Sequence, residues 1–448
     1  MIDRDLAWLG ETTGGRLIAG TRQPGPRRVV IDSREVGPGD LFVGLRGAWV
    51  KGSEFAVRAL EMGAWGAVVE EEYADVAGAS ARPHQDGEPQ QVVLAVSDPL
   101  ASLQSLARGW RRELGAEVVG ITGSTGKTST KDILAAMLAP HLKTHANRQN
   151  LNTEIGLPLS ILEAEPGTEA LVLEMAMRGE EQIAELVAVA EPDVGVIVNV
   201  GPVHLELLGT VERVAAAKAE LVRDLAPGAS CVLPAHEPLL DGHRRDDLDT
   251  WTFGPGGDVS LASFEAGRAT VEARGELLEL EPAFEEPHNL LNMLAGVAAA
   301  RALGVRPGGA LEPAFSSMRG EIVELASGVT VVNDCYNANP MSMRAALSHL
   351  ARSPAQRRLA VLGQMAELGP DAASYHRDIG RHASEEGVDV LVTVGREALP
   401  YTEGYDGEAH SVGEPEEAAG LLDELAHPGD RVLIKGSRSV GLERVLGG

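Results

Sequence analysis

The stretch that most constrains the fold of this chain is GITGSTGKTST, which runs from Gly120 to Thr130. The apolar run EVVGIT that leads into it predicts a strand, and STKDILAAML, which follows the glycines, predicts a helix. A glycine-rich turn between a strand and a helix presents backbone amides and a helix N-terminus, and this arrangement binds phosphate groups. The sequence therefore predicts a phosphate-binding loop inside an α/β sheet.

This loop departs from the standard phosphate-loop pattern, which is a glycine, four residues and then Gly-Lys-Ser/Thr. Counted back from the Gly-Lys-Thr at 126–128, the first glycine should stand where the chain has Ile121. The glycines fall instead at positions 120, 123 and 126. We interpret the stretch as a variant loop in which Lys127 supplies a charge and Thr128 a magnesium ligand; the alternative is a plain glycine turn beside a surface lysine.

Alternating strand-like and helix-like segments divide the chain into three α/β regions. We expect domains at residues 1–98, 99–312 and 313–448. The central region should form a mainly parallel sheet around the phosphate loop, with extra antiparallel strands within 237–287. The last region should form a doubly wound, Rossmann-like sheet, whose ligands bind at the carboxyl ends of the strands. Residues 74–91 are expected to be a loop.

The composition of the chain limits the partners it can have. The 448 residues carry a formal net charge of −27, and such an acidic surface repels nucleic acid. No apolar run is long enough to span a membrane, and the acidic first residues predict no signal peptide. Cys231 and Cys335 suggest neither a disulfide framework nor a metal knuckle. We therefore expect a cytoplasmic protein with small anionic ligands and, as the simplest assumption, a monomer.

Three further residues of the central region are candidates for chemistry. Glu174 ends the strand-like LVLEMAM, where an acid can hold magnesium or act as an ordinary cap. His204 in GPVHLELLG is, on spacing alone, more typical of a structural histidine. Lys218 lies in the alanine-rich VAAAKAELV. If buried it would lose its proton readily and could form a carbamate with carbon dioxide, but the sequence alone favours a side chain that reaches solvent.

Three segments are rich in amide side chains. They are HANRQNLNTEIGLPLSIL from His145, HNLLN from His288 and NDCYNANP from Asn333. Amides near strand ends suit polar ligands such as adenine and ribose. Asn and Asp at such positions also favour turns, and both interpretations stay open at this point.

Taken together, these motifs resemble the Mur ligase family. GITGSTGKTST, LNTEIGLPLSIL, LVLEMAM, HLELLGT with AAAKAEL, HNLLNMLAG, VVNDCYNANPMSMRAAL and VLIKGSRS occur in the order found in that family. IDSREVGPGDLFVGLRG is similar to the family's UDP-sugar domain, so the resemblance covers essentially the whole chain. It implies an N-terminal UDP-binding domain, a central ATPase domain and a C-terminal Rossmann-like domain.

The resemblance also implies a reaction, because NDCYNANPMSMRAAL is similar to the branch of the family that adds D-Ala-D-Ala. ATP and Mg²⁺ would serve to join UDP-N-acetylmuramoyl-tripeptide to that dipeptide through an acyl phosphate, in peptidoglycan precursor synthesis. A carboxylate is a poor electrophile and has to be activated first, which gives the phosphate loop a purpose. The rivals are another amino-acid-adding Mur ligase and a nucleotide-binding homologue without ligase chemistry.

The site residues that the resemblance implies fall into three groups. ATP would be bound by Gly123, Ser124, Thr125, Gly126, Lys127, Thr128 and Ser129, with Asn289, Arg319, Asp334, Tyr336 and Asn337 at the adenine and ribose. The catalytic residues would be Lys127, Glu174, His204 and Lys218, and the metal ligands would be Thr128, Glu174, His204 and Lys218 as a carbamate. The other substrates would meet Ser33, Arg34, Gly44 and Arg46 at the UDP group, Asn150, Asn152 and Thr153 at the muramoyl peptide, and Lys435 and Arg438 near the reacting groups or the dipeptide.

The chain also departs from the family pattern at several positions. Lys51 and Ser53 lie in VKGSEF, where Asp-Gly-His-Asp-Phe is usual, which puts the nucleotide-sugar contacts in question. Gln364 stands in GQM where an acid is usual, and LLGT and AKAEL replace commoner variants. None of these changes removes a residue assigned to phosphoryl transfer.

Overall fold

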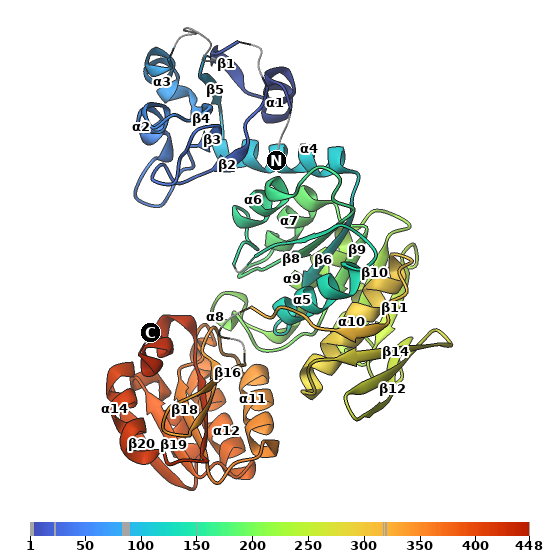
Figure 1. The fold of residues 1–448 in the computed structure, drawn as a ribbon, viewed down its shortest axis with the longest axis vertical. Helices are drawn as coiled ribbons and strands as arrows, with labels where there is room; N and C mark the ends of the chain where they lie inside the picture. The colour runs from blue at the N-terminus through green and yellow to red at the C-terminus, as the bar shows by residue number, and fades with distance from the viewer. Residues whose placement is uncertain are drawn as a thin grey trace.

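The protein forms three α/β units, each built around its own sheet and arranged in chain order along the long axis of the molecule (Figure 1). The computed structural model describes residues 4–21, 24–82, 90–148, 150–316, 318 and 320–447. No helix in these ranges is long and apolar enough to cross a membrane. The predicted three-domain α/β fold is confirmed, while the domain limits at 98 and 312 stay predictions.

The first sheet has five strands in the order β1-β5-β4-β3-β2, of which β1 is antiparallel to β5 and the others are parallel. Its unit consists of α1 (Leu6–Thr13), β1 (Arg16–Ala19), β2 (Arg28–Val30), β3 (Asp40–Val43), η1 (Gly52–Phe55), α2 (Ala56–Glu61), β4 (Gly66–Glu70), η2 (Glu71–Tyr73), α3 (Ala74–Ser80) and β5 (Val92–Val96). The loop expected at 74–91 is wrong in part, because α3 occupies its first residues. Ala74 and Ala77 are buried there, since their small side chains let the helix pack closely.

Helix α4 (Pro99–Leu114) joins the first unit to the second. Asp98 caps its start, because the Asp98 carboxylate accepts hydrogen bonds from the backbone amides of Leu100 and Ala101 at 2.8 and 3.2 Å. Leu103, Leu106 and Trp110 are buried on one face of α4, and the indole of Trp110 donates to the carbonyl of Ala164 at 3.0 Å. The apolar core of the first unit therefore continues into the second.

The central sheet has ten strands in the order β15-β14-β13-β12-β11-β10-β9-β6-β8-β7. The parallel strands around β6 and the antiparallel β12, β13 and β14 were both predicted. The unit consists of β6 (Glu117–Thr122), α5 (Lys127–Leu138), β7 (Thr144–Ala146), α6 (Gly156–Glu163), β8 (Ala170–Glu174), α7 (Gln182–Ala190), β9 (Val194–Ile197), α8 (Leu205–Leu208), α9 (Val211–Asp224), β10 (Ser230–Pro234), η3 (Pro238–His243), β11 (Asp249–Phe253), β12 (Val259–Glu265), β13 (Arg268–Ala273), β14 (Glu276–Pro282), α10 (Pro287–Ala302) and β15 (Gly309–Leu311). Val118 and Val119 of β6 are buried in different cores, because successive side chains of a strand point to opposite faces. Both faces of the sheet are therefore covered.

The C-terminal sheet has six strands in the order β16-β17-β21-β18-β19-β20, all parallel except β16. Its unit consists of β16 (Glu321–Glu324), β17 (Thr330–Asp334), α11 (Pro340–Arg352), β18 (Arg358–Gly363), η4 (Gly369–Asp371), α12 (Ala372–Glu385), β19 (Val390–Val394), η5 (Arg396–Ala398), α13 (Pro400–Gly404), β20 (Glu408–Val412), α14 (Pro415–Leu425), β21 (Arg431–Lys435), η6 (Arg438–Val440) and η7 (Leu442–Leu446). Separate apolar cores cover its two faces, as the doubly wound prediction requires. Asp334 and Lys435 are paired residues at the carboxyl ends of β17 and β21, where such sheets bind ligands.

Candidate active site

The predicted phosphate loop lies between the end of β6 and the start of α5. Gly126 is the N-cap of α5 and has a φ of 76°, in the left-handed region that glycine adopts without strain. A Cβ on Gly126 would also lie 2.6 Å from Oδ1 of Asn292 on α10, so a larger residue does not fit. Ile121 is buried within β6, and the chain turns only after it. This explains why no glycine is needed at position 121.

Asn199, just after β9, holds the loop in place from the neighbouring strand. Its Oδ1 accepts hydrogen bonds from the backbone amides of Ser124 and Thr125 at 3.1 and 3.0 Å, and its Nδ2 donates to the Thr125 carbonyl at 3.1 Å. The Nζ of Lys127 donates to the carbonyl of Gly123 at 2.8 Å, across the loop. Asn199 was not predicted; its position at the carboxyl end of a strand beside β6 is the signal that could have found it.

Thr128 and Glu174 meet beside the phosphate loop. Thr128 Oγ1 donates to Oε2 of Glu174 at 2.6 Å, and both side chains are buried. Glu174 is the last residue of β8, and its Oε1 accepts a hydrogen bond from Nδ2 of Asn152 at 2.8 Å. The fold therefore brings together one residue of the loop, one strand-end acid and one of the predicted substrate-binding asparagines.

The asparagine-rich segment around Asn147 supports this arrangement. The Asn147 amide donates to the carbonyls of Leu151 and Glu174 at 2.7 and 3.0 Å, and its Oδ1 accepts from the backbone amide of Glu174 at 2.8 Å. These bonds fix the end of β8. Asn150 and Thr153 are exposed in the same segment, so their predicted contact with a substrate stays a prediction.

The Thr128 hydroxyl and the Glu174 carboxylate are the oxygen donors to consider for the predicted magnesium site. In the described part of the chain, no three side chains of His, Cys, Asp or Glu form a group that could hold a metal. Magnesium, however, usually takes one or two protein oxygens and fills its other positions with phosphate and water. The Thr128 hydroxyl and the Glu174 carboxylate therefore fit Mg²⁺ that arrives with a nucleotide.

Lys218 is buried in α9, with 2% of its surface exposed. Burial lowers the pKa of its ammonium well below the ordinary value, and the nearby charge of Lys127 lowers it further. The expectation from sequence alone that this side chain reaches solvent is therefore wrong. These surroundings favour the neutral amine, which is the form that reacts with carbon dioxide.

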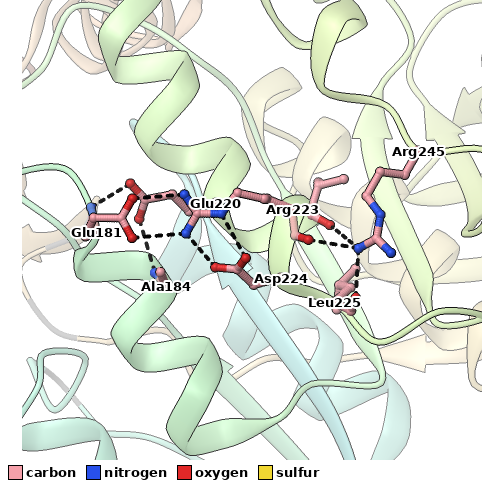
Figure 2. A network of polar contacts seen from close by, with 8 residues as sticks. Glu181, Ala184, Glu220, Arg223, Asp224, Leu225 and Arg245 are labelled. Atoms are coloured by element: carbon pink, nitrogen blue, oxygen red, sulfur yellow. Dashed lines mark hydrogen bonds and ion pairs between the residues drawn. The ribbon is translucent and has the colours of Figure 1, made fainter.

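A network of polar contacts holds the helix that carries Lys218 (Figure 2). The Glu220 carboxylate accepts hydrogen bonds from the backbone amides of Glu181 and Ala184, at 2.6 and 3.1 Å, at the start of α7. Arg223 pairs with the Glu181 carboxylate at 2.9 Å. At the end of α9, the Arg245 guanidinium donates to three backbone carbonyls at 2.7 to 3.1 Å. These contacts fix α9 against α7 and leave little freedom to the buried lysine.

His204 lies at the boundary between the central and C-terminal domains. It is the N-cap of α8, with a φ of 54°. Its Nδ1 forms a hydrogen bond with the carboxylate of Glu367, which belongs to the C-terminal domain. The predicted metal role of His204 stays a prediction, and Glu367 was not predicted at all.

The predicted adenine and ribose residues come from both sides of the same domain boundary. Asn289 lies on α10, where its Oδ1 accepts from the amide of Asn292, the neighbour of the phosphate loop, at 3.4 Å. The pKa of His288 is lowered by burial, and the charges of Asp334 and Lys435 also act on it. The start of α10 therefore lies close to the carboxyl ends of β17 and β21.

Lys435 is almost fully buried at this boundary, with 2% of its surface exposed. Its Nζ donates to the Asp334 carboxylate at 2.6 Å and to the Asn337 carbonyl at 2.9 Å. Asn339, the N-cap of α11, donates to the backbone carbonyl of Ser124 at 3.5 Å. The segment after β17 therefore reaches from a buried lysine to the phosphate loop.

The remaining predicted residues of the C-terminal domain lie close by. The backbone amide of Tyr336 donates to the carbonyl of Met318 at 3.3 Å, and Arg438 contacts the sulfur of Met318 at 3.4 Å. Arg438 also pairs with Glu443 at 3.2 Å. Arg319 lies outside the described residues.

The predicted UDP-binding residues form a separate group in the first sheet. The Ser53 hydroxyl donates to the carbonyl of Gly44 at 3.0 Å and accepts from the backbone amide of Glu70 at 3.1 Å. A Cβ on Gly44 would lie 2.6 Å from the Ser53 backbone. Arg46 pairs with the Glu70 carboxylate. Ser53 thus closes the loop internally.

The other two members of this group differ in burial. Ser33 is buried, while Arg34 is exposed and pairs with Asp32 at 2.6 Å. The unusual Lys51 pairs with Glu72 at 2.6 Å. Figure 1 shows this sheet and the C-terminal domain at opposite ends of the molecule. These residues belong to a different sheet from the phosphate loop, and their role stays a prediction.

Three Mur ligase family models match successive parts of the chain: the catalytic domain model at residues 27–111, the middle domain at 121–300 and the glutamate ligase domain at 318–438. Curated relatives carry the name UDP-N-acetylmuramoyl-tripeptide–D-alanyl-D-alanine ligase. One from Synechocystis is 34% identical over 93% of this chain and 90% of the relative. One from Mycobacterium tuberculosis is 35% identical over 99% and 97% of the two chains.

Solved structures agree with these matches. A MurF crystal structure from Acinetobacter baumannii has a TM-score of 0.85 at 27% identity, covering 98% of this chain and 97% of that one. A MurF ligase from Thermotoga maritima in complex with ADP has a TM-score of 0.79 at 32% identity, covering 94% and 96%. The similarity therefore extends over all three domains.

Proposed function

The chain belongs to the Mur ligase family, and on that premise we propose that it joins D-Ala-D-Ala to UDP-N-acetylmuramoyl-tripeptide while ATP becomes ADP and phosphate. One observation carries the choice of substrates. The likeness to enzymes of that name, at 34% and 35% identity, runs through the N-terminal domain as well as the ATPase domain. The product is a peptidoglycan precursor, and we place the reaction in the cytoplasm, where ATP and nucleotide-activated sugars occur.

The reaction needs two steps, the first at the γ-phosphorus of ATP and the second at the activated carbonyl carbon. A carboxylate oxygen of the tripeptide attacks the γ-phosphorus of ATP, the bond to the bridging oxygen breaks, and ADP leaves. The amine nitrogen of D-Ala-D-Ala then attacks the acyl phosphate, loses a proton, and expels phosphate from a tetrahedral intermediate. Such chemistry depends mainly on positioning and on stabilising charge.

The residues around the phosphate loop suit the first step. Lys127 places a positive charge where the β- and γ-phosphates would lie, at the N-terminus of α5. Thr128 and Glu174 would hold Mg²⁺, which supplies charge neutralisation to the phosphates when it is bound. Lys218, as a carbamate, and His204 would complete this group. Asn152, bonded to Glu174, would lie toward the muramoyl peptide.

The adenosine part of ATP would lie between the central and C-terminal domains. Asn289 would bind it from α10, and Asp334, Tyr336 and Asn337 from the segment after β17. The bond between Asn339 and the Ser124 carbonyl supports this placement, since it brings that segment to the phosphate loop. For Arg319, which lies outside the described residues, the proposed contact with adenine or ribose rests on the sequence alone.

The assay that tests this function measures phosphate release and product mass with ATP, the UDP-linked tripeptide and D-Ala-D-Ala. We expect turnover with the dipeptide and none with single amino acids. Turnover with a single amino acid instead would point to another Mur ligase. ATP binding without substrate-dependent phosphate release would point to a homologue that lacks ligase activity. Tripeptides with lysine and with diaminopimelate at position three would define the accepted substrate.

We predict that Lys435→Met raises the KM for ATP by about tenfold and leaves the KM for D-Ala-D-Ala unchanged. The reason is that the Lys435 ammonium is already bonded to Asp334 and Asn337, so its loss would disturb the ATP side of the site. A factor of ten corresponds to about 1.4 kcal/mol, close to the lower end of what a hydrogen bond to a charged group contributes, roughly 1.5–3 kcal/mol. Steady-state kinetics with each substrate varied in turn checks this.

Two controls accompany this variant. Removing one member of a buried ion pair costs on the order of 3–5 kcal/mol in stability, so thermal unfolding is measured in parallel. Arg377→Met removes an exposed cation of the same domain, which pairs with Glu403 at 3.0 Å, and should change neither KM. A rise in the dipeptide KM alone would instead place Lys435 against the dipeptide.

A further inference from the structure

We propose that Glu367 is a positioning residue: from the C-terminal domain it fixes the imidazole of His204, a candidate catalytic residue of the central domain. The kinetic part of this inference rests on the proposed function. Glu367 lies in the connection between β18 and η4, on the side of the C-terminal domain that meets α8. Figure 1 shows α8 between the two domains.

Glu367 makes three contacts with the central domain. Its carboxylate forms a hydrogen bond with Nδ1 of His204, and its Oε1 lies 3.6 Å from Nε of Arg178. Its backbone carbonyl accepts a hydrogen bond from the amide of Glu206 at 3.2 Å. The main chain and the side chain of Glu367 thus both bind the segment from His204 to Glu206.

The backbone on both sides of this contact is strained. His204 has a φ of 54° and Glu367 a φ of 62°, and neither is a glycine or asparagine. A left-handed conformation costs a residue with a side chain roughly 1–2 kcal/mol. Strained residues persist where the surrounding structure fixes them, and they cluster at functional sites. Here two of them face each other across a domain boundary.

The domain boundary is closely packed next to this pair. A Cβ on Gly369, whose φ is 67°, would lie 3.4 Å from the amide nitrogen of Glu206 and 3.4 Å from the carbonyl carbon of Leu205. At Gly201, before His204, a Cβ would lie 2.0 Å from the sulfur of Met341 on α11. A side chain at Gly201 would displace Met341, and Gly369 lies within ordinary contact distance of the α8 backbone, so the two domains pack directly against each other beside Glu367 and His204.

The contact determines which nitrogen of His204 carries the proton. An ionised carboxylate can only accept hydrogen bonds, so Nδ1 of His204 is the donor. In the neutral ring, Nε2 then keeps its lone pair. A carboxylate behind a histidine orients the ring in this way at many metal sites.

The consequence is a coupling between domain position and the active site. His204 belongs to the central domain, but the group that orients it comes from the C-terminal domain. When the C-terminal domain is in the position seen here, the imidazole of His204 is fixed and its Nε2 can accept a hydrogen bond or bind a metal. When that domain moves away, His204 loses this partner.

The kinetic test compares Glu367→Ala, Glu367→Gln and Glu403→Ala. We expect Glu367→Ala to lower kcat about 10- to 100-fold, as losses of such orienting groups do, with the KM values for ATP and D-Ala-D-Ala unchanged. Glu367→Gln keeps an acceptor oxygen and should recover part of the loss. Glu403→Ala removes a carboxylate whose ion pair lies within the C-terminal domain, and it should resemble the unaltered protein. Equal kcat in Glu367→Ala and Glu403→Ala would overturn the proposal, as would no recovery in the glutamine variant.

A spectroscopic test does not depend on turnover. Nitrogen-15 NMR of the histidine side chains in the full chain without ligands reports which ring nitrogen is protonated, and a His204→Gln spectrum assigns the signal. We expect His204 with the proton on Nδ1, and a mixture of the two neutral forms in Glu367→Ala. A ring protonated on Nε2 in the unaltered protein contradicts the inference. If D-Ala-D-Ala is not a substrate, the proposed function fails, whereas this spectrum still decides the role of Glu367.

Discussion

Lys127→Ala is expected to lower turnover about 1,000-fold while the protein stays folded, a loss typical of removing one preorganised group that stabilises developing charge. The ammonium of Lys127 crosses the phosphate loop to the Gly123 carbonyl at 2.8 Å, at the N-terminus of α5. It therefore lies where the transferred phosphoryl group would carry its negative charge. The bond to Gly123 holds this charge in place across the loop before a nucleotide binds.

Phosphate release with saturating substrates measures this loss. Lys143→Ala is the matched control, since Lys143 lies in the same domain and pairs on the surface with Glu165 at 2.9 Å. It should retain full activity, because exposed ion pairs contribute about 0–1 kcal/mol. Near-normal turnover by Lys127→Ala would refute the phosphate role of this lysine. Thermal unfolding distinguishes loss of chemistry from loss of the fold.

The main architecture could be predicted because each buried strand is an apolar run bounded by polar or glycine residues. β6, β8 and β9 are buried strands of this kind. The edge strands were harder to predict. β16 reads EIVE with mostly exposed residues, so nothing in its hydrophobic pattern separates it from a loop. An edge strand is defined by its one partner, here β17, and local sequence carries no information about that partner.

Single residues of the site were also hard to predict, because local sequence does not show which distant residues they contact. Thr128 and Glu174 were predicted separately from strand-end and loop patterns, and the parallel pairing of β6 with β8 brings them together. Asn199 and Glu367 contact residues that are distant in sequence. A single Asn or Glu is too common in proteins for sequence alone to predict such a contact. Lys218 was misjudged on sequence alone, because its burial depends on how α9 packs against the rest of the central domain and not on its neighbours in the chain.

Lys218→Ala is expected to lower turnover by a similar factor of about 1,000, because under the proposed function it removes the carbamate that would help to hold Mg²⁺. The amine nitrogen of the neutral lysine bonds to the carbon of carbon dioxide and releases one proton, which leaves a carboxylate on the side chain. Burial and the charge of Lys127 favour the neutral amine that this step needs. Phosphate release is again the measurement. Mass spectrometry of the intact protein at low pH cannot detect the carbamate, because carbamates decompose in acid.

Chemical rescue separates a carbamate from an ordinary cationic lysine. The alanine variant leaves a space in a helix that the Glu220 and Arg245 contacts hold in place, so a small acid can enter without the helix shifting. Acetate, propionate or butyrate should restore part of the turnover, whereas propylamine should not. The Lys127→Ala variant should respond to neither acid nor amine, since its missing group is a cation fixed by a turn. Rescue of Lys218→Ala by propylamine and not by propionate would show that the ammonium itself acts, and the carbamate would have to be abandoned.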